Sequence, residues 1–125
     1  MALMEKPFDD YFNRVYNRDT YNCAHLVCEA WEDITGNNIS EAFKGFLQPA
    51  SERTAELSVH NLLKRSRELV DPCIVLMTHP NVAPHVGIYT KGKVLHIREI
   101  GVHYQPLNMA TFGYTNRRFY TCKTT

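Results

Sequence analysis

The sequence lacks an excess of charge of either sign, and it lacks any long hydrophobic run. Its 125 residues carry 14 basic and 13 acidic side chains, which gives a net charge of +1. This balance gives no reason to expect nucleic acid or an anionic membrane surface as a partner. No apolar run reaches the roughly 20 residues that cross a bilayer, so we expect no membrane insertion.

The first ten residues include acidic side chains and no apolar core of a signal peptide. We therefore expect no signal peptide and a protein that is cytoplasmic at synthesis. The length fits a single domain over residues 1–125, which is large enough to bury a core without metals or disulfides.

The four cysteines, Cys23, Cys28, Cys73 and Cys122, do not show the spacing of a metal site. Six histidines are present, but the sequence contains no Cys-x-x-Cys pair and no His-x-x-x-His pair. Two disulfides would fit the even count, yet no export signal places them in an oxidising compartment. We expect reduced thiols, no metal and no cofactor.

Hydrophobic periodicity predicts helices first and strands afterwards. The best-supported helix runs over Cys23–Thr35, with Asn22 as its N-cap and Gly36 as its stop signal. Apolar spacing also predicts a short helix over 8–16 and one or two helices over 57–69.

After residue 71 the apolar pattern changes to that of strands, interrupted by a loop with two prolines over 79–84. The expected strands are 73–77, 86–89, 94–97, a continuation or new strand over 98–104, and an edge-type strand over 118–122. The predicted fold class is α+β, with N-terminal helices packed on a C-terminal antiparallel sheet.

A two-residue turn at Lys91-Gly92 determines how 86–89 and 94–97 pair. Because opposed residues share a face of a sheet, His85 and His96 then lie on the same face. Gly87 lies between them and leaves space for both rings. The opposite face is wholly apolar, which supports this register, and it consists of Val86, Ile88, Leu95 and Ile97.

A cysteine on the first turn of a helix is favoured as a thiolate by the positive end of the helix dipole. Cys23 has that position, and the hairpin could supply it with two imidazoles. We predict Cys23 as nucleophile, His85 as base and His96 as the group that orients the base. The backbone amide of Cys23 and a tyrosine hydroxyl would meet the oxyanion. The chemistry is amide or thioester acyl transfer, although the same three residues also fit an ordinary core.

This arrangement resembles the NlpC-type cell-wall peptidases, papain-like cysteine hydrolases that cut the stem peptides of peptidoglycan. Their nucleophile segment, Tyr/Phe-Asp-Cys-Ser-Gly-Leu-Val, is matched by YNCAHLV at 21–27. Their His-Val-Gly-Ile-Tyr segment is matched at 85–89, and the following strand that ends in histidine is matched at 94–97. The resemblance spans about 21–97. It implies a papain-like NlpC-type fold and a peptidoglycan stem peptide as substrate.

The nucleophile segment departs from the family pattern, because Asn22 replaces aspartate and Ala24-His25 replaces Ser-Gly. In family members that recognise a free amine, the aspartate and serine help to hold it, so that specificity is in question here. The family's tyrosine near the oxyanion has two candidates, Tyr11 and Tyr16, of which we prefer Tyr16. The resemblance thus implies Tyr16 and Asn22 as oxyanion and substrate-binding residues.

Compact family members without a signal peptide resemble phage-encoded ones, which form part of tail tips and open the wall during DNA delivery. The resemblance therefore implies phage tail-tip proteins as partners and a place in the virion tail. Two alternatives stay open. One is an inactive structural or assembly subunit of a phage tail that keeps the fold, and the other is a thiol acyltransferase or amidase.

Overall fold

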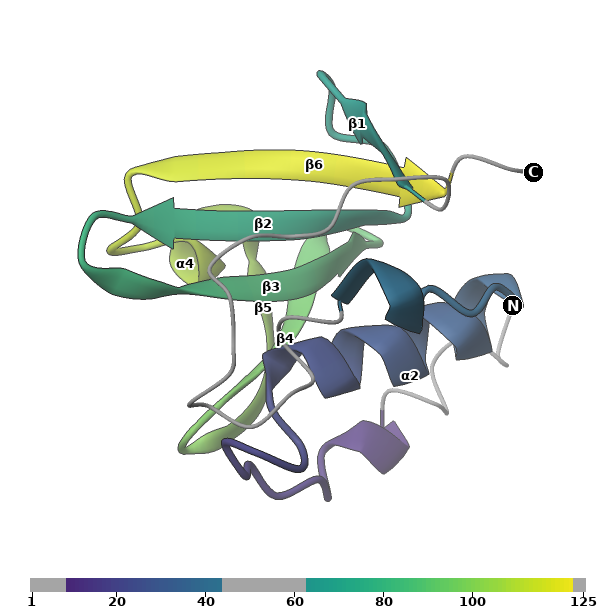
Figure 1. The fold of residues 1–125 in the computed structure, drawn as a ribbon, viewed down its shortest axis with the longest axis vertical. Coiled ribbons are helices and arrows are strands. Elements are labelled where there is room, and N and C mark those ends of the chain that lie inside the picture. Colours follow the sequence, from purple (N-terminus) through teal and green to yellow (C-terminus); the bar gives the residue numbers. More distant parts are fainter. Residues whose placement is uncertain (1–8, 44–62, 123–125) are drawn as a thin grey trace.

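The computed structural model describes residues 9–43 and 63–122, which form one antiparallel sheet with helices on its two faces (Figure 1). The fold class is α+β, as predicted. The helices are α2 (Cys23–Thr35), the 3-10 helix η2 (Ser40–Phe43) and α4 (Leu107–Ala110). The strands are β1 (Leu63–Ser66), β2 (Cys73–His79), β3 (Val82–Thr90), β4 (Lys93–Arg98), β5 (Gly101–Pro106) and β6 (Asn116–Cys122).

Helix α2 begins and ends where the capping residues predict. The side-chain oxygen of Asn22 accepts hydrogen bonds from the backbone N–H groups of Ala24 at 2.9 Å and His25 at 3.4 Å. His25 completes a capping box, because its Nδ1 accepts from the backbone N–H of Asn22 at 3.0 Å. Gly36 ends the helix with a φ of 82°, a left-handed conformation that suits glycine.

The strand order is β1-β6-β2-β3-β4-β5. Strands β2 to β5 form a meander, and β6 returns to the outer side of β2. The prediction of an edge strand at 118–122 is wrong, because β1 pairs with β6 from Leu63↔Cys122 to Ser66↔Phe119. The outer edge therefore belongs to the short strand β1.

Three other predictions of local structure are wrong. Of the helix expected over 8–16, only 9–11 are helical among the described residues 9–16. Val15 near its end is 80 % exposed, so the apolar spacing there does not mark a buried face. Residues 63–66, expected in a helix, form β1, because pairing with β6 outweighs local preference, and the rest of that prediction over 57–62 lies outside the described residues. The loop expected over 79–84 is a two-residue turn at 80–81 between β2 and β3.

The hairpin of β3 and β4 has the predicted turn and the predicted register in its first three pairs, but the pairing expected further along, over 86–87 and 96–97, is not formed. Lys91 and Gly92 both have positive φ, of 54° and 88°, as a two-residue turn between twisted strands requires. The pairs Ile88↔Leu95, Tyr89↔Val94 and Thr90↔Lys93 make up the whole β3–β4 ladder. Beyond these pairs β3 stays with β2 and β4 stays with β5. Figure 1 shows β4 and β5 leaving β3 at a steep angle.

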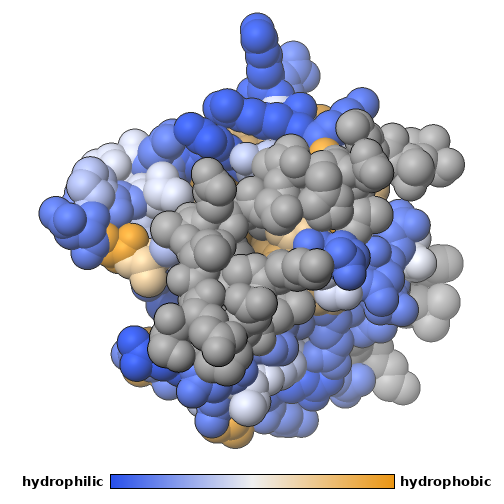
Figure 2. Space-filling view, in the orientation of Figure 1, coloured by the Kyte–Doolittle hydropathy of each residue, from blue (hydrophilic) through white to orange (hydrophobic). Residues whose placement is uncertain are grey.

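The core lies mainly between α2 and the sheet. The helix contributes Leu26, Val27, Ala30 and Trp31, and the sheet face opposite includes Ile74, Leu76, Val86, Ile88, Leu95 and Ile97. A smaller cluster of Cys73, Val75 and Met77 on the other face packs against Leu107 of α4. The described residues on the face in Figure 2 are mainly hydrophilic, with small separate apolar areas. No helix in 9–43 or 63–122 is long and apolar enough to cross a membrane.

Gly87 allows β3 and β4 to approach each other at the last pairs of their ladder. A Cβ added there would lie 2.7 Å from Val94 Cγ1 and 3.1 Å from His96 Cβ. We predict that Gly87→Ala lowers the free energy of unfolding by about 2 kcal/mol, because the strands must move apart. Urea unfolding measures this loss.

Gly36→Ala is the matched control for Gly87→Ala. Nothing lies within 4 Å of a Cβ at this position, so the variant tests only the cost of a positive φ, about 1 kcal/mol. Gly87→Ala should also displace the ring of His96, whereas Gly36→Ala should not. Equal stability of Gly87→Ala and the wild type would contradict the prediction.

Candidate active site

A cavity of about 390 Å³ lies where β3 and β4 separate. Its wall combines residues 82–85 of β3 with residues 97–100 at the end of β4. Cys23, on the first turn of α2, lines the same cavity, as do Tyr16, Asn22 and Tyr114. Because the ladder has ended, the gap joins the α2 side of the sheet, which carries Cys23, to the side that carries His85. The cavity thus brings together four of the five predicted site residues.

The fifth residue, His96, lies fully buried behind His85. The Nε2 of His85 and the Nδ1 of His96 are 2.9 Å apart, which confirms that the two rings share one face of the sheet. The Nε2 of His96 lies 2.8 Å from the Oε1 of Gln105 on β5. The three side chains form a line that starts at the cavity, passes through the fully buried His96 and ends at the partly buried Gln105.

This line determines which nitrogen of each neutral ring carries the proton. The Oε1 of Gln105 is only an acceptor, so the Nε2 of His96 is the donor. The Nδ1 of His96 then has a lone pair and accepts from the Nε2–H of His85. The Nδ1 of His85 is therefore the unprotonated nitrogen, which makes it the atom that can accept a proton.

Both imidazoles are held in the neutral form. Burial, with smaller effects of His96 and Arg98, lowers the pKa of His85 well below its ordinary 6.5. Burial lowers the pKa of His96 to about 4, although its hydrogen bond with Gln105 acts in the opposite direction. A neutral imidazole near pH 7 is a base that is ready to take a proton.

Three residues at the site were not predicted from the sequence: Gln105, Tyr114 and Arg98. The ring of Tyr114 stacks on His85, with an interplanar angle of 10° and 6.0 Å between centroids. Gln105 could have been found by placing a two-residue turn at 99–100. The resulting pairs, Arg98↔Gly101 and His96↔His103, put Gln105 on the same face as the histidines.

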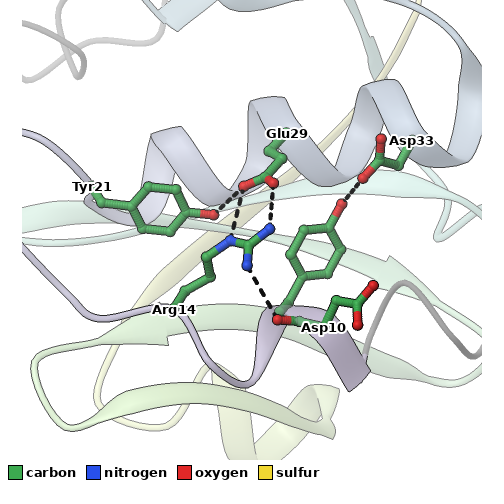
Figure 3. A network of polar contacts seen from close by, with 6 residues as sticks. Asp10, Arg14, Tyr21, Glu29 and Asp33 are labelled. Carbon is green, nitrogen blue, oxygen red and sulfur yellow. Dashed lines mark hydrogen bonds and ion pairs between the residues drawn. The ribbon is translucent and has the colours of Figure 1, made fainter.

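The segment before α2 is held against this helix by polar contacts (Figure 3). Arg14 and Tyr21 both point toward Glu29, with 2.6 Å between Arg14 Nη2 and Glu29 Oε2. Tyr11 donates a hydrogen bond to Asp33 one turn further along. Burial alone would raise the pKa of Glu29, but the hydrogen bonds from Arg14 and Tyr21 outweigh it and lower this pKa. These contacts restrain the segment that carries Tyr16.

Tyr16 and Asn22 both line the cavity. Tyr16 is half-buried and lies between the anchored residues Arg14 and Tyr21. Asn22 is buried, and its amide nitrogen donates to the carbonyl of Arg18 at 3.0 Å while its oxygen caps α2. Their roles at the oxyanion and in substrate binding stay predictions.

None of the four cysteines is in a disulfide. Burial raises the pKa of Cys28 to about 12, and burial likewise raises the pKa of Cys73 to about 11. The Sγ of Cys122 accepts a hydrogen bond from the indole of Trp31 at 3.1 Å. Cys23 differs from these thiols because it lies on a cavity wall that also holds a histidine.

No protein-family model matches the sequence, and no curated protein matches it either. Its function is therefore inferred from the geometry of the site.

The buried imidazoles make stability depend on pH. The unfolded chain takes up a proton on His96 near pH 6.5, whereas the folded protein resists until about pH 4. Unfolding therefore becomes easier as pH falls through this window. We predict that the free energy of unfolding decreases by about 3 kcal/mol for His96, with a further loss in the same direction from His85.

Urea unfolding between pH 4 and pH 7 measures this slope. In His96→Gln the titrating group is removed, so the dependence on pH should become flatter. A slope that is the same in the wild type and in His96→Gln would contradict the assignment.

Proposed function

We propose that this protein is a cysteine hydrolase that cleaves amide bonds by acyl transfer to Cys23. The observation that carries this proposal is the line of His85, His96 and Gln105, because it leaves the Nδ1 of His85 unprotonated in a residue that lines the same cavity as Cys23. A core histidine pair would not need to end at a cavity, nor to share it with a thiol on the first turn of a helix.

The reaction follows from the proton positions. The Nδ1 of His85 takes the proton of the Cys23 thiol as the sulfur attacks the carbonyl carbon of the substrate. The imidazolium then gives that proton to the leaving amine, and a thioester on Cys23 remains. Water attacks the thioester while His85 accepts its proton, and the acid and the free thiol are released. His96 and Gln105 hold the base in the required tautomer.

The low pKa of His85 favours a neutral thiol and imidazole before the substrate binds. Proton transfer and attack then occur together, so the negative charge develops on the substrate oxygen. The N-terminus of α2 lies at the cavity, and its dipole stabilises negative charge there. Tyr16 is our candidate for a second donor to this oxyanion.

For the substrate we propose peptidoglycan stem peptides. This choice is supported by the likeness of 21–27, 85–89 and 94–97 to the NlpC-type segments, in an α+β fold. A cavity of about 390 Å³ falls in the range of ligand-binding pockets and suits a short peptide segment. The same likeness supports a place among phage tail-tip proteins, where the enzyme would open the wall.

One observation favours a second candidate, acyl transfer with an apolar small substrate or lipid. Two apolar residues of the cavity wall face solvent, since Ile100 is 83 % exposed and Val82 is 49 % exposed. An acyl chain could cover them. Acyl-thioester probes of different chain length would separate this activity from peptide hydrolysis.

We predict that Cys23→Ala loses turnover of purified muropeptides by at least about a thousandfold, because no other group on the cavity wall can form the thioester. The fold should persist, since alanine is smaller than cysteine at this position. Cys28→Ala, one turn further along α2, is the control and should keep activity. Unchanged turnover in Cys23→Ala would exclude the mechanism, whereas absence of turnover in the wild type as well would leave a structural subunit.

A second prediction concerns the pH profile. Activity needs neutral His85, so the acid limb of kcat/KM should lie below pH 6.5 in the wild type. In Gln105→Glu a carboxylate faces His96 and favours its imidazolium, so the acid limb should move to higher pH. Gln105→Leu removes the acceptor without adding charge and should lower kcat/KM by about tenfold with no such shift. Identical acid limbs in all three proteins would contradict the role of Gln105.

A further inference from the structure

Arg98 places a positive charge on the wall of the cavity that contains Cys23 and His85. It is the last residue of β4 and it is half-buried. Its Nη2 donates to the carbonyl oxygen of Ala110 at 3.3 Å, and its Cζ lies 5.8 Å from the centroid of the Tyr114 ring. These contacts fix the guanidinium on the same side of the sheet as the imidazoles.

No carboxylate in 9–43 or 63–122 forms an ion pair with this guanidinium. A guanidinium has five N–H donors, and a carbonyl oxygen takes up only one of them. A partly desolvated cation without a counter-ion is unfavourable unless a ligand supplies the negative charge. Glu99 also lines the cavity, but it is exposed at the β4–β5 turn, where solvent screens its charge.

In the ligand-free protein, this charge also opposes the proposed chemistry. Arg98 contributes to lowering the pKa of both His85 and His96. It thus disfavours the imidazolium that forms when His85 accepts the proton of Cys23. An anion bound to the guanidinium would remove this opposition at the moment when the substrate is in place.

We propose that Arg98 is an anion-binding subsite of this cavity and that it holds a carboxylate close to the bond attacked by Cys23. The substrate class is then an amide that carries a free carboxylate near its scissile carbonyl. This inference rests on the proposed function for the identity of the bond, but the subsite itself can be tested without turnover. Guanidinium and carboxylate match because both are planar and can form two parallel hydrogen bonds.

The test compares two alkylating reagents of similar size that differ in charge, iodoacetate and iodoacetamide. Each forms a bond from the sulfur of Cys23 to carbon while the carbon–iodine bond breaks, iodide leaves and the thiol proton passes to His85 or solvent. The ratio of the two rates at Cys23 reports the preference for an anion. Fragment-ion mass spectrometry separates this site from Cys28.

Arg98→Met keeps a long side chain and removes the charge, so the ratio of iodoacetate to iodoacetamide rates should fall by about tenfold. Arg98→Lys should retain part of the preference. Arg65→Met removes an exposed charge from β1, at the far edge of the sheet, and should leave the ratio unchanged. Because both rates are measured on the same variant, any general change in thiol reactivity cancels.

An unchanged ratio in Arg98→Met, or an equal fall in Arg65→Met, would overturn the subsite. Rising KCl should lower the wild-type ratio, and this measurement applies even where Arg98→Met does not fold. A ratio that is indifferent to KCl would also count against it.

Turnover separates this proposal from the proposed function. Two stem peptides that differ only in a free carboxylate or a carboxamide beside the scissile bond are compared by kcat/KM. Loss of the carboxylate preference in Arg98→Met supports the subsite in catalysis. Absence of any turnover together with an Arg98-dependent alkylation ratio would refute the hydrolase and keep the anion site. Turnover without preference for the carboxylate would refute the subsite and keep the hydrolase.

Discussion

The separation of β3 from β4 is the constraint on which the site depends. The two strands pair over three residues each and then follow different neighbours. An intact ladder would keep the two faces of the sheet apart, with Cys23 on one side and His85 on the other. Pro84 suits the separated part of β3, because it has no N–H to donate and the β3–β4 ladder does not reach it.

Burial keeps the two histidines neutral, and it also costs free energy of folding because their polar nitrogens leave water. Two imidazoles in a low-dielectric interior are tolerated because each ring nitrogen between His85 and Gln105 has a partner at 2.8 or 2.9 Å. The same burial keeps both rings neutral. A protonated His85 would therefore be unfavourable unless a negative charge nearby compensates it. In the proposed mechanism, the substrate and the helix dipole supply this compensation.

Short sequence signals predicted the ends of α2 and the β3–β4 turn. They did not predict the pairing of strands that lie far apart in the sequence. Asn22 and Gly36 mark the ends of α2 by capping, and the Lys91-Gly92 turn sets the register that joins His85 to His96. Each of these depends on a few adjacent residues. The β1 strand could not be predicted in this way, because its only reason to be extended is β6, more than fifty residues later. The place of Gln105 beside His96 could be predicted only from the register of β4 with β5.

The residues around Cys23 that differ from the NlpC-type pattern have a structural role at the start of α2. Asn22 and His25 use their side chains to cap α2 against each other's backbone, so their polar atoms serve the helix start. An aspartate at position 22 would add a negative charge to the cavity in which the proposed mechanism develops a negative charge on the substrate oxygen. With asparagine there, the described wall of the cavity carries the half-buried cation of Arg98, while its carboxylate, Glu99, is exposed. The proposed anion subsite at Arg98 would select anionic groups over amines, which is the reverse of the specificity that the NlpC-type resemblance associates with an acidic residue before the cysteine.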